Sequence, residues 1–134
     1  MSRTIAIANQ KGGVGKTTTS VNLSACLAQL GKKILLIDTD PQGNATSGVG
    51  ISKGEVQHCI YDILIDDVEP KDVILSTKVE NLDVIPATIS LAGAEIELVS
   101  TISREVRLKH ALQSVEEDYD YIIIDCPPSL GLLT

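Results

Sequence analysis

Ile5-Ala-Ile-Ala8 begins the stretch that decides the fold of this 134-residue chain. It continues with Asn-Gln and then with Lys11-Gly-Gly-Val-Gly-Lys-Thr-Thr18. The short apolar run predicts a buried strand, and the glycine-rich segment after it predicts a turn. Glycines let the backbone curl so that successive N–H groups point into one concavity. A helix is predicted from Thr17 to Leu30, and the free amides of its first turn favour an anion. The stretch therefore predicts a loop that binds phosphate groups.

Two lysines and a threonine give this loop its chemistry. Lys16 supplies a point charge for the outer phosphates, and the Thr17 hydroxyl can ligate Mg²⁺. The strict phosphate-loop pattern begins with glycine, whereas this chain has Gln10 at that position. Lys11 is either a solvated surface lysine or a charge delivered to the nucleotide of a neighbouring subunit, in the manner of an arginine finger. The predicted nucleotide-binding residues are Lys11, Gly12, Gly13, Val14, Gly15, Lys16, Thr17 and Thr18.

Carboxylates follow two further apolar runs. Asp38 and Asp40 come after Ile34–Ile37, and Asp125 comes after Tyr121–Ile124. Ligands bind at the carboxyl ends of the strands in parallel sheets, so these residues are candidates for a site. We assign Asp38 and Asp125 to the magnesium shell, and Asp40 to orienting or deprotonating the attacking water. The alternative is that these residues only satisfy local hydrogen bonds in turns.

Cys126, directly after Asp125, raises the possibility of a nucleophile. We reject it, because no histidine lies nearby in the sequence and phosphoryl transfer needs no covalent step.

The remaining pattern predicts an α/β fold of the P-loop NTPase type. Strands alternate with helical patterns, which implies right-handed crossovers and a doubly wound, mainly parallel sheet with helices on both faces. Gly31 is predicted to stop the first helix. The other predicted elements are a strand at Leu82–Ile85, short helices at Cys59–Ile65 and Pro70–Ser76, and helices at Ser90–Thr101 and Arg104–Glu117, the last with Val106, Leu108, Leu112 and Val115 on one face.

Composition limits the function classes. The net charge of −7 predicts that this segment repels a nucleic-acid backbone. Three widely spaced cysteines without a CxxC pair predict free, mostly buried thiols rather than disulfides or a zinc site. The apolar residues after Pro128 have no stop signal, so we expect residues 1–134 to be the N-terminal part of a single ATPase domain.

Three motifs together resemble the ParA/Soj family of partitioning ATPases, which carry a deviant Walker A loop. They are the segment Lys11–Thr18, the run from Asp38 to Thr46 (Asp-Thr-Asp-Pro-Gln-Gly-Asn-Ala-Thr), and the run from Asp125 to Gly131 (Asp-Cys-Pro-Pro-Ser-Leu-Gly). The resemblance covers the whole chain, including Leu91–Leu98 between the motifs. It implies that Lys11 reaches across an ATP-sandwiched dimer, with Gly12 at the dimer contact, and that Asp40 is needed for hydrolysis.

The resemblance also implies ATP and Mg²⁺ as ligands and a ParB-type partner protein. It implies a protein that is cytoplasmic, associates with the nucleoid and does not bind a membrane. It implies non-specific DNA binding by the full-length protein, through residues outside this segment. Two alternatives stay open: a MinD-like ATPase that positions cell division at a membrane, and a fragment that holds nucleotide without turnover. Nitrogenase iron proteins fit less well, because Cys59 and Cys126 do not match their cluster pattern.

Overall fold

The computed structural model describes residues 3–7, 14–39, 43–52, 56–60, 62–63, 68–87 and 101–125, with the backbone alone at 14–18 and 101–105. Its strands and helices alternate along most of the chain, as the sequence predicts, apart from two successive strands at Leu75–Ser76 and Leu82–Ile85. In chain order they are β1 (Arg3–Ile7), α1 (Val14–Gln29), β2 (Ile34–Asp38), α2 (Asn44–Gly48), the 3₁₀ turn η2 (Pro70–Asp72), β3 (Leu75–Ser76), β4 (Leu82–Ile85), α5 (Thr101–Leu112), the 3₁₀ turn η3 (Glu116–Asp118) and β5 (Tyr121–Asp125).

Within the described residues, the strands form one five-stranded sheet in the order β1-β5-β2-β4-β3. β5 pairs in parallel with both β1 and β2, and β2 also pairs in parallel with β4. β3 is antiparallel to β4. The predicted mainly parallel sheet is therefore confirmed. The prediction that the first strand is buried is wrong, because β1 lies at the edge of the sheet and its residues are exposed or half-buried.

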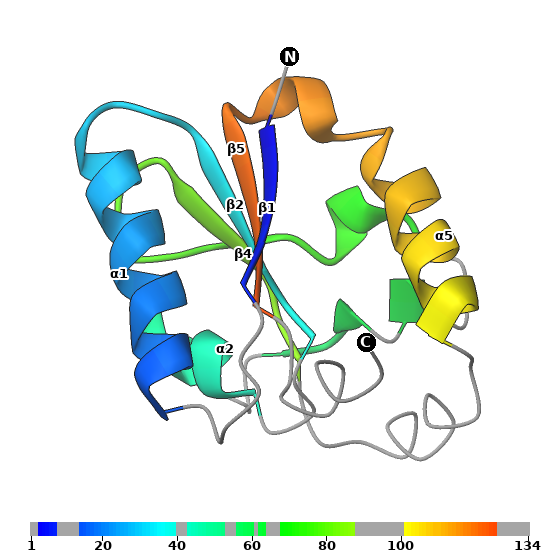
Figure 1. Ribbon diagram of the computed structural model, residues 1–134, viewed down its shortest axis with the longest axis horizontal. Coiled ribbons are helices and arrows are strands. Elements are labelled where there is room, and N and C mark those ends of the chain that lie inside the picture. Colours follow the sequence, from blue (N-terminus) through cyan, green and yellow to red (C-terminus); the bar gives the residue numbers. More distant parts are fainter. Residues whose placement is uncertain are drawn as a thin grey trace.

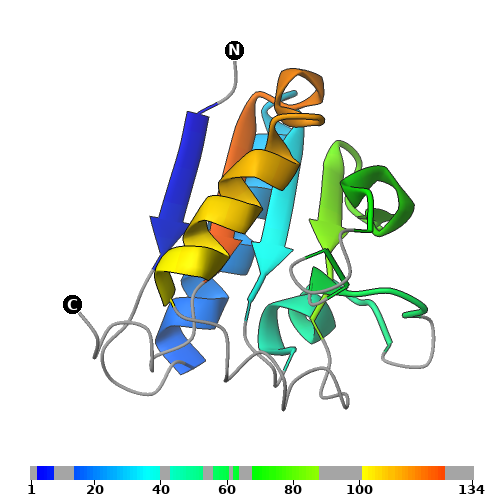
Figure 2. The ribbon, with the colours of Figure 1, turned by 90° about the vertical axis from the view of Figure 1, so that its right-hand side faces the viewer.

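Helices cover both faces of the sheet, with α1 and α2 on one side and α5 on the other (Figures 1 and 2). Every residue of β2 is buried, as in a parallel strand covered on both faces. Its side chains alternate between two hydrophobic clusters. Ile34 and Leu36 pack in the cluster that contains Ala28 of α1, whereas Leu35 and Ile37 pack in the cluster that contains Leu112 of α5.

Gly31 ends α1 as predicted. The amide of Gly31 donates to Ala28 O at 3.0 Å, and the amide of Lys32 donates to Leu27 O at 3.2 Å. This pair of bonds is the Schellman motif, which needs a left-handed residue at the position of Gly31. Gly31 has φ +90°, so the motif is present.

We expect Gly31→Ala to lower the free energy of unfolding by about 1–2 kcal/mol, because a left-handed backbone costs other residues that much. Steric overlap is not the cause, since nothing lies within 4 Å of an added Cβ. Urea unfolding of the complete protein measures the loss. Lys32→Ala, at an exposed position in the same turn, should change stability by less than about 0.5 kcal/mol. Equal losses in the two variants would contradict this account.

Two predicted helices differ from the structure. Pro70–Ser76 is not a helix: the short turn η2 is followed by β3, where Leu75 pairs with Val84. A bend at 77–82 allows this pairing, because the Thr77 hydroxyl donates to Leu82 O at 2.8 Å and Asn81 takes a left-handed conformation with φ 70°. The helix predicted at 104–117 spans Thr101–Leu112 instead.

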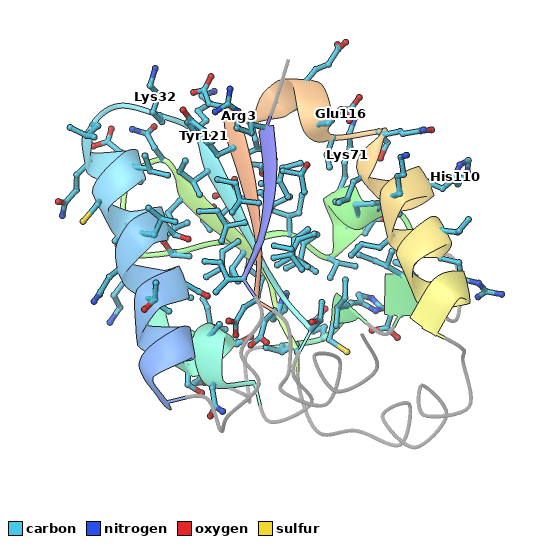
Figure 3. The ribbon with its side chains drawn as sticks, in the orientation of Figure 1. Arg3, Lys32, Lys71, His110, Glu116 and Tyr121 are labelled. Atoms are coloured by element: carbon cyan, nitrogen blue, oxygen red, sulfur yellow. The ribbon has the colours of Figure 1, made fainter. Side chains whose placement is uncertain are left out.

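The predicted apolar face of this helix is also wrong at one position, because Val106 is 63% exposed. Lys109 and His110 lie in its last turn. Positively charged side chains are favourable there, because the C-terminus of a helix carries partial negative charge. The His110 side chain points away from the sheet (Figure 3). The helix predicted at 90–101 lies outside the described residues apart from Thr101, with which α5 begins.

The predicted cysteine environments are confirmed in part. Cys59 is a buried free thiol, whereas Cys26 is a free thiol at an exposed position of α1. Cys126 lies outside the described residues.

Candidate functional site

The carboxyl edge of the sheet brings two of the predicted site residues together. Asp38 ends β2 and Asp125 ends β5, and the two residues are Cα partners in the parallel register. Both are fully buried, at 0% exposure. The N-terminus of α1 lies at this same edge (Figure 1). Two buried carboxylates beside a helix N-terminus form the candidate site.

The segment that carries the predicted phosphate loop connects this edge to α1. β1 ends at Ile7 and α1 begins at Val14, so residues 8–13 link a strand to a helix. This is the context that a phosphate-binding loop requires. Helix α1 begins at Val14, earlier than the predicted Thr17. Its first amides lack partners within the helix and would favour an anion.

The structure describes only part of the predicted phosphate-binding residues. The backbone of Val14, Gly15, Lys16, Thr17 and Thr18 is helical, and their side chains are not described. Asp40 and residues 11–13 lie outside the described residues. Their assigned roles stay predictions.

Asp38 is held by Thr46 of α2. Its Oδ2 accepts the Thr46 amide at 2.9 Å and the Thr46 hydroxyl at 2.8 Å. Thr46 lies in the first turn of α2, where amides need acceptors, so the Asp38 carboxylate caps this short helix from the neighbouring strand end. The Thr46 Oγ1 also accepts the amide of Ala87 at 3.0 Å. Thr46 thus joins the ends of β2 and β4.

Asp125 is held by Ser20 of α1. The Ser20 hydroxyl donates to Asp125 Oδ1 at 2.7 Å, and both residues are fully buried. The backbone carbonyl of Asp125 accepts the amide of Thr39 at 3.1 Å and its hydroxyl at 2.8 Å. These bonds fix the end of β5 against the end of β2.

The sequence did not predict Ser20 and Thr46 as parts of the site. Ser20 follows Thr17 by one helical turn, which would have been the signal for a hydroxyl on the same face of the helix. Thr46 closes the Asp38–Thr46 run, but its role depends on the fold.

These residues fit a magnesium ion. Mg²⁺ prefers oxygen ligands and is usually held by one or two carboxylates together with water and phosphate oxygens. Asp38 and Asp125 supply two carboxylates at one edge, and phosphate groups bound by the loop between β1 and α1 would supply further oxygens.

A separate polar cavity of about 580 Å³ lies at the opposite edge of the sheet. Tyr119 donates its hydroxyl to Asp83 Oδ2 there at 2.7 Å. Burial, followed by this hydrogen bond, raises the pKa of Tyr119 well above its usual range. Arg3 and Tyr121, which begin β1 and β5, lie toward the same end of the sheet (Figure 3). The cavity is lined by Lys33, Asn81, Asp83, Glu117, Asp118, Tyr119 and Asp120.

Within the part of the chain that the structure describes, no helix has the length and apolar character needed to cross a membrane.

The family described as "AAA domain" matches residues 2–134. The sporulation initiation inhibitor protein Soj of Bacillus subtilis is 74% identical over 134 residues, covering 100% of this chain and 53% of that protein. The chromosome partitioning protein ParA of Myxococcus xanthus is 54% identical over 132 residues, covering 98% of this chain and 47% of that protein.

A solved structure of a protein with a different name is similar in both sequence and fold. The crystal structure of cobyrinic acid a,c-diamide synthase from Mycobacterium smegmatis, with bound ATP analogue and magnesium, superposes with a TM-score of 0.86 at 44% identity. The match covers 99% of this chain and 54% of that one. The chain spans about half the length of the relatives it matches.

Proposed function

Because this chain belongs to the ParA/Soj family of the MinD/ParA superfamily, we propose that the complete protein is a magnesium-dependent ATPase that partitions chromosomes or plasmids. ATP would bridge two subunits, the dimer would bind DNA, and hydrolysis with a ParB-type partner would release it. The observation that carries the proposal is the pairing of two buried carboxylates, Asp38 and Asp125, at the edge where α1 begins.

The residues of this edge divide the work. Lys16 and the first amides of α1 would hold the phosphates, and Thr17, Asp38 and Asp125 would hold the hydrated metal. A bound magnesium ion would neutralise charge on the transferring phosphoryl group. Asp40, which follows the end of β2, would orient the attacking water. Lys11 would reach the nucleotide of the second subunit.

Two observations support ATP and Mg²⁺ as the ligands. The two buried carboxylates lie side by side at one edge and offer the oxygen ligands that Mg²⁺ prefers. A structural neighbour at 44% identity contains an ATP analogue and magnesium.

The net charge of this segment and the family of the chain lead us to propose how the complete protein contacts DNA and where it acts. With a net charge of −7, this segment is a poor surface for DNA, so the complete protein would contact DNA through other residues. We place the complete protein in the cytoplasm, at the nucleoid.

ATP-dependent dimerisation tests the proposal. We expect the complete protein to shift from monomer to dimer when a non-hydrolysable ATP analogue and Mg²⁺ are added. Lys11→Ala should weaken the dimer at least about tenfold while nucleotide still binds, because a charged hydrogen bond across the interface is lost. Analytical ultracentrifugation measures the dimer, and titration calorimetry measures the nucleotide.

Lys71→Ala is the matched control, since Lys71 is an exposed lysine in η2 on the far side of the sheet from α1. Unchanged dimerisation of Lys11→Ala would refute the role of Lys11. Vesicle binding by the complete protein, with no DNA binding, would instead favour a membrane-positioning ATPase.

A further inference from the structure

We propose that Ser20 is a positioning residue that aims the Asp125 carboxylate, an inference that rests on the proposed function. The Ser20 hydroxyl donates to Asp125 Oδ1 at 2.7 Å across a separation of 105 residues in the sequence. Both side chains have 0% exposure. A bond between a hydroxyl and a buried carboxylate is of the strong, charge-assisted kind.

The place of Ser20 in α1 explains what this bond does. Ser20 follows Thr17 by three residues, so the two positions are neighbours on one face of the helix. The helix that begins at the phosphate-binding edge is therefore tied directly to the strand end that carries Asp125. α1 and β5 pack against each other elsewhere as well.

The bond matters because the carboxylate of Asp125 can otherwise rotate about its terminal torsion. The terminal torsion of an aspartate is broad, so its rotamer alone does not set the direction of its oxygens. A fixed hydroxyl donor restricts that torsion. Residues that orient metal-binding groups in this way typically change metal affinity by about 10- to 100-fold when they are mutated.

Ser24 provides a matched control on the same helix. It is also a serine with 0% exposure, and its hydroxyl donates to the backbone carbonyl of Ser20 at 2.7 Å. This is a local bond within the helix. Replacing either serine by alanine removes one buried hydroxyl from α1, but Ser20→Ala alone removes the bond to Asp125.

The test is magnesium-dependent nucleotide binding by the complete protein. A fluorescent ADP analogue is titrated in EDTA and at increasing Mg²⁺. We expect Ser20→Ala to need about tenfold more Mg²⁺ for half of the magnesium-induced gain in affinity. Binding in EDTA should match the wild type, Ser24→Ala should match it throughout, and Ser20→Thr, which keeps the hydroxyl, should restore the wild-type Mg²⁺ requirement.

Equal Mg²⁺ requirements in Ser20→Ala and Ser24→Ala would overturn the assignment. If Ser20→Ala does not fold, Ser20→Cys takes its place, because the thiol fills the site yet donates only weakly. A wild-type Mg²⁺ requirement in Ser20→Cys would then overturn it. A wild-type protein that binds no nucleotide, or binds it without regard to Mg²⁺, would overturn the proposed function and this inference with it.

Discussion

Asp125→Asn should lower the ATP turnover of the complete protein by about 10- to 100-fold, the usual effect of changing a group that orients or holds a metal's ligands. The substitution removes the charge but keeps an oxygen that can accept the Ser20 hydroxyl, so the fold should survive. Asp125 is fully buried at the end of β5, beside Asp38. Steady-state phosphate release at several Mg²⁺ concentrations measures the loss.

Asp83→Asn is the control for this prediction. It makes the same change of carboxylate to amide at a residue that accepts a hydrogen bond from Tyr119, in the cavity at the far edge of the sheet. We expect its turnover to match the wild type. A similar loss in both variants would mean that Asp125 acts through stability rather than through the metal.

Leu36→Ala should destabilise the protein by about 2–5 kcal/mol, the range for removing a large aliphatic side chain from a packed core. Leu36 has 0% exposure and lies in β2, between β5 and β4. It packs in the cluster that includes Val84, Ile123 and Ala28. The free energy of unfolding in urea measures the effect.

Val106→Ala is the control for Leu36→Ala. Val106 is 63% exposed on α5, so its loss should change stability by less than about 0.5 kcal/mol. A loss below 1 kcal/mol in Leu36→Ala would contradict the central position of β2.

The sequence predicted those parts of the fold that local patterns determine. The wholly apolar run before Asp38 indicated a strand covered on both faces, and Gly31 marked the end of α1 through its left-handed backbone. Leu75–Ser76 was missed because a strand of two residues has no period to detect. Its conformation comes from pairing with β4, which the sequence does not display.

The candidate site likewise contains residues that local sequence patterns predicted and residues that depend on contacts between distant segments. Asp38 and Asp125 were predicted because each follows an apolar run, and their adjacency follows from parallel pairing. Ser20 was missed because its partner lies 105 residues away. Thr46 was missed because its bonds to Asp38 and Ala87 depend on how three segments meet.

The place of β5 between β1 and β2 sets the distance between the ends of those two strands. Neighbouring strands lie about 4.8 Å apart, so the end of β1 and the end of β2 are separated by about 9.6 Å. Ile5 and Leu36 both align with Ile123, so neither strand is displaced along the other. A ligand that joins the loop after β1 to the carboxylate of Asp38 must therefore span two strand spacings, and Asp125, at the end of β5, lies midway between them.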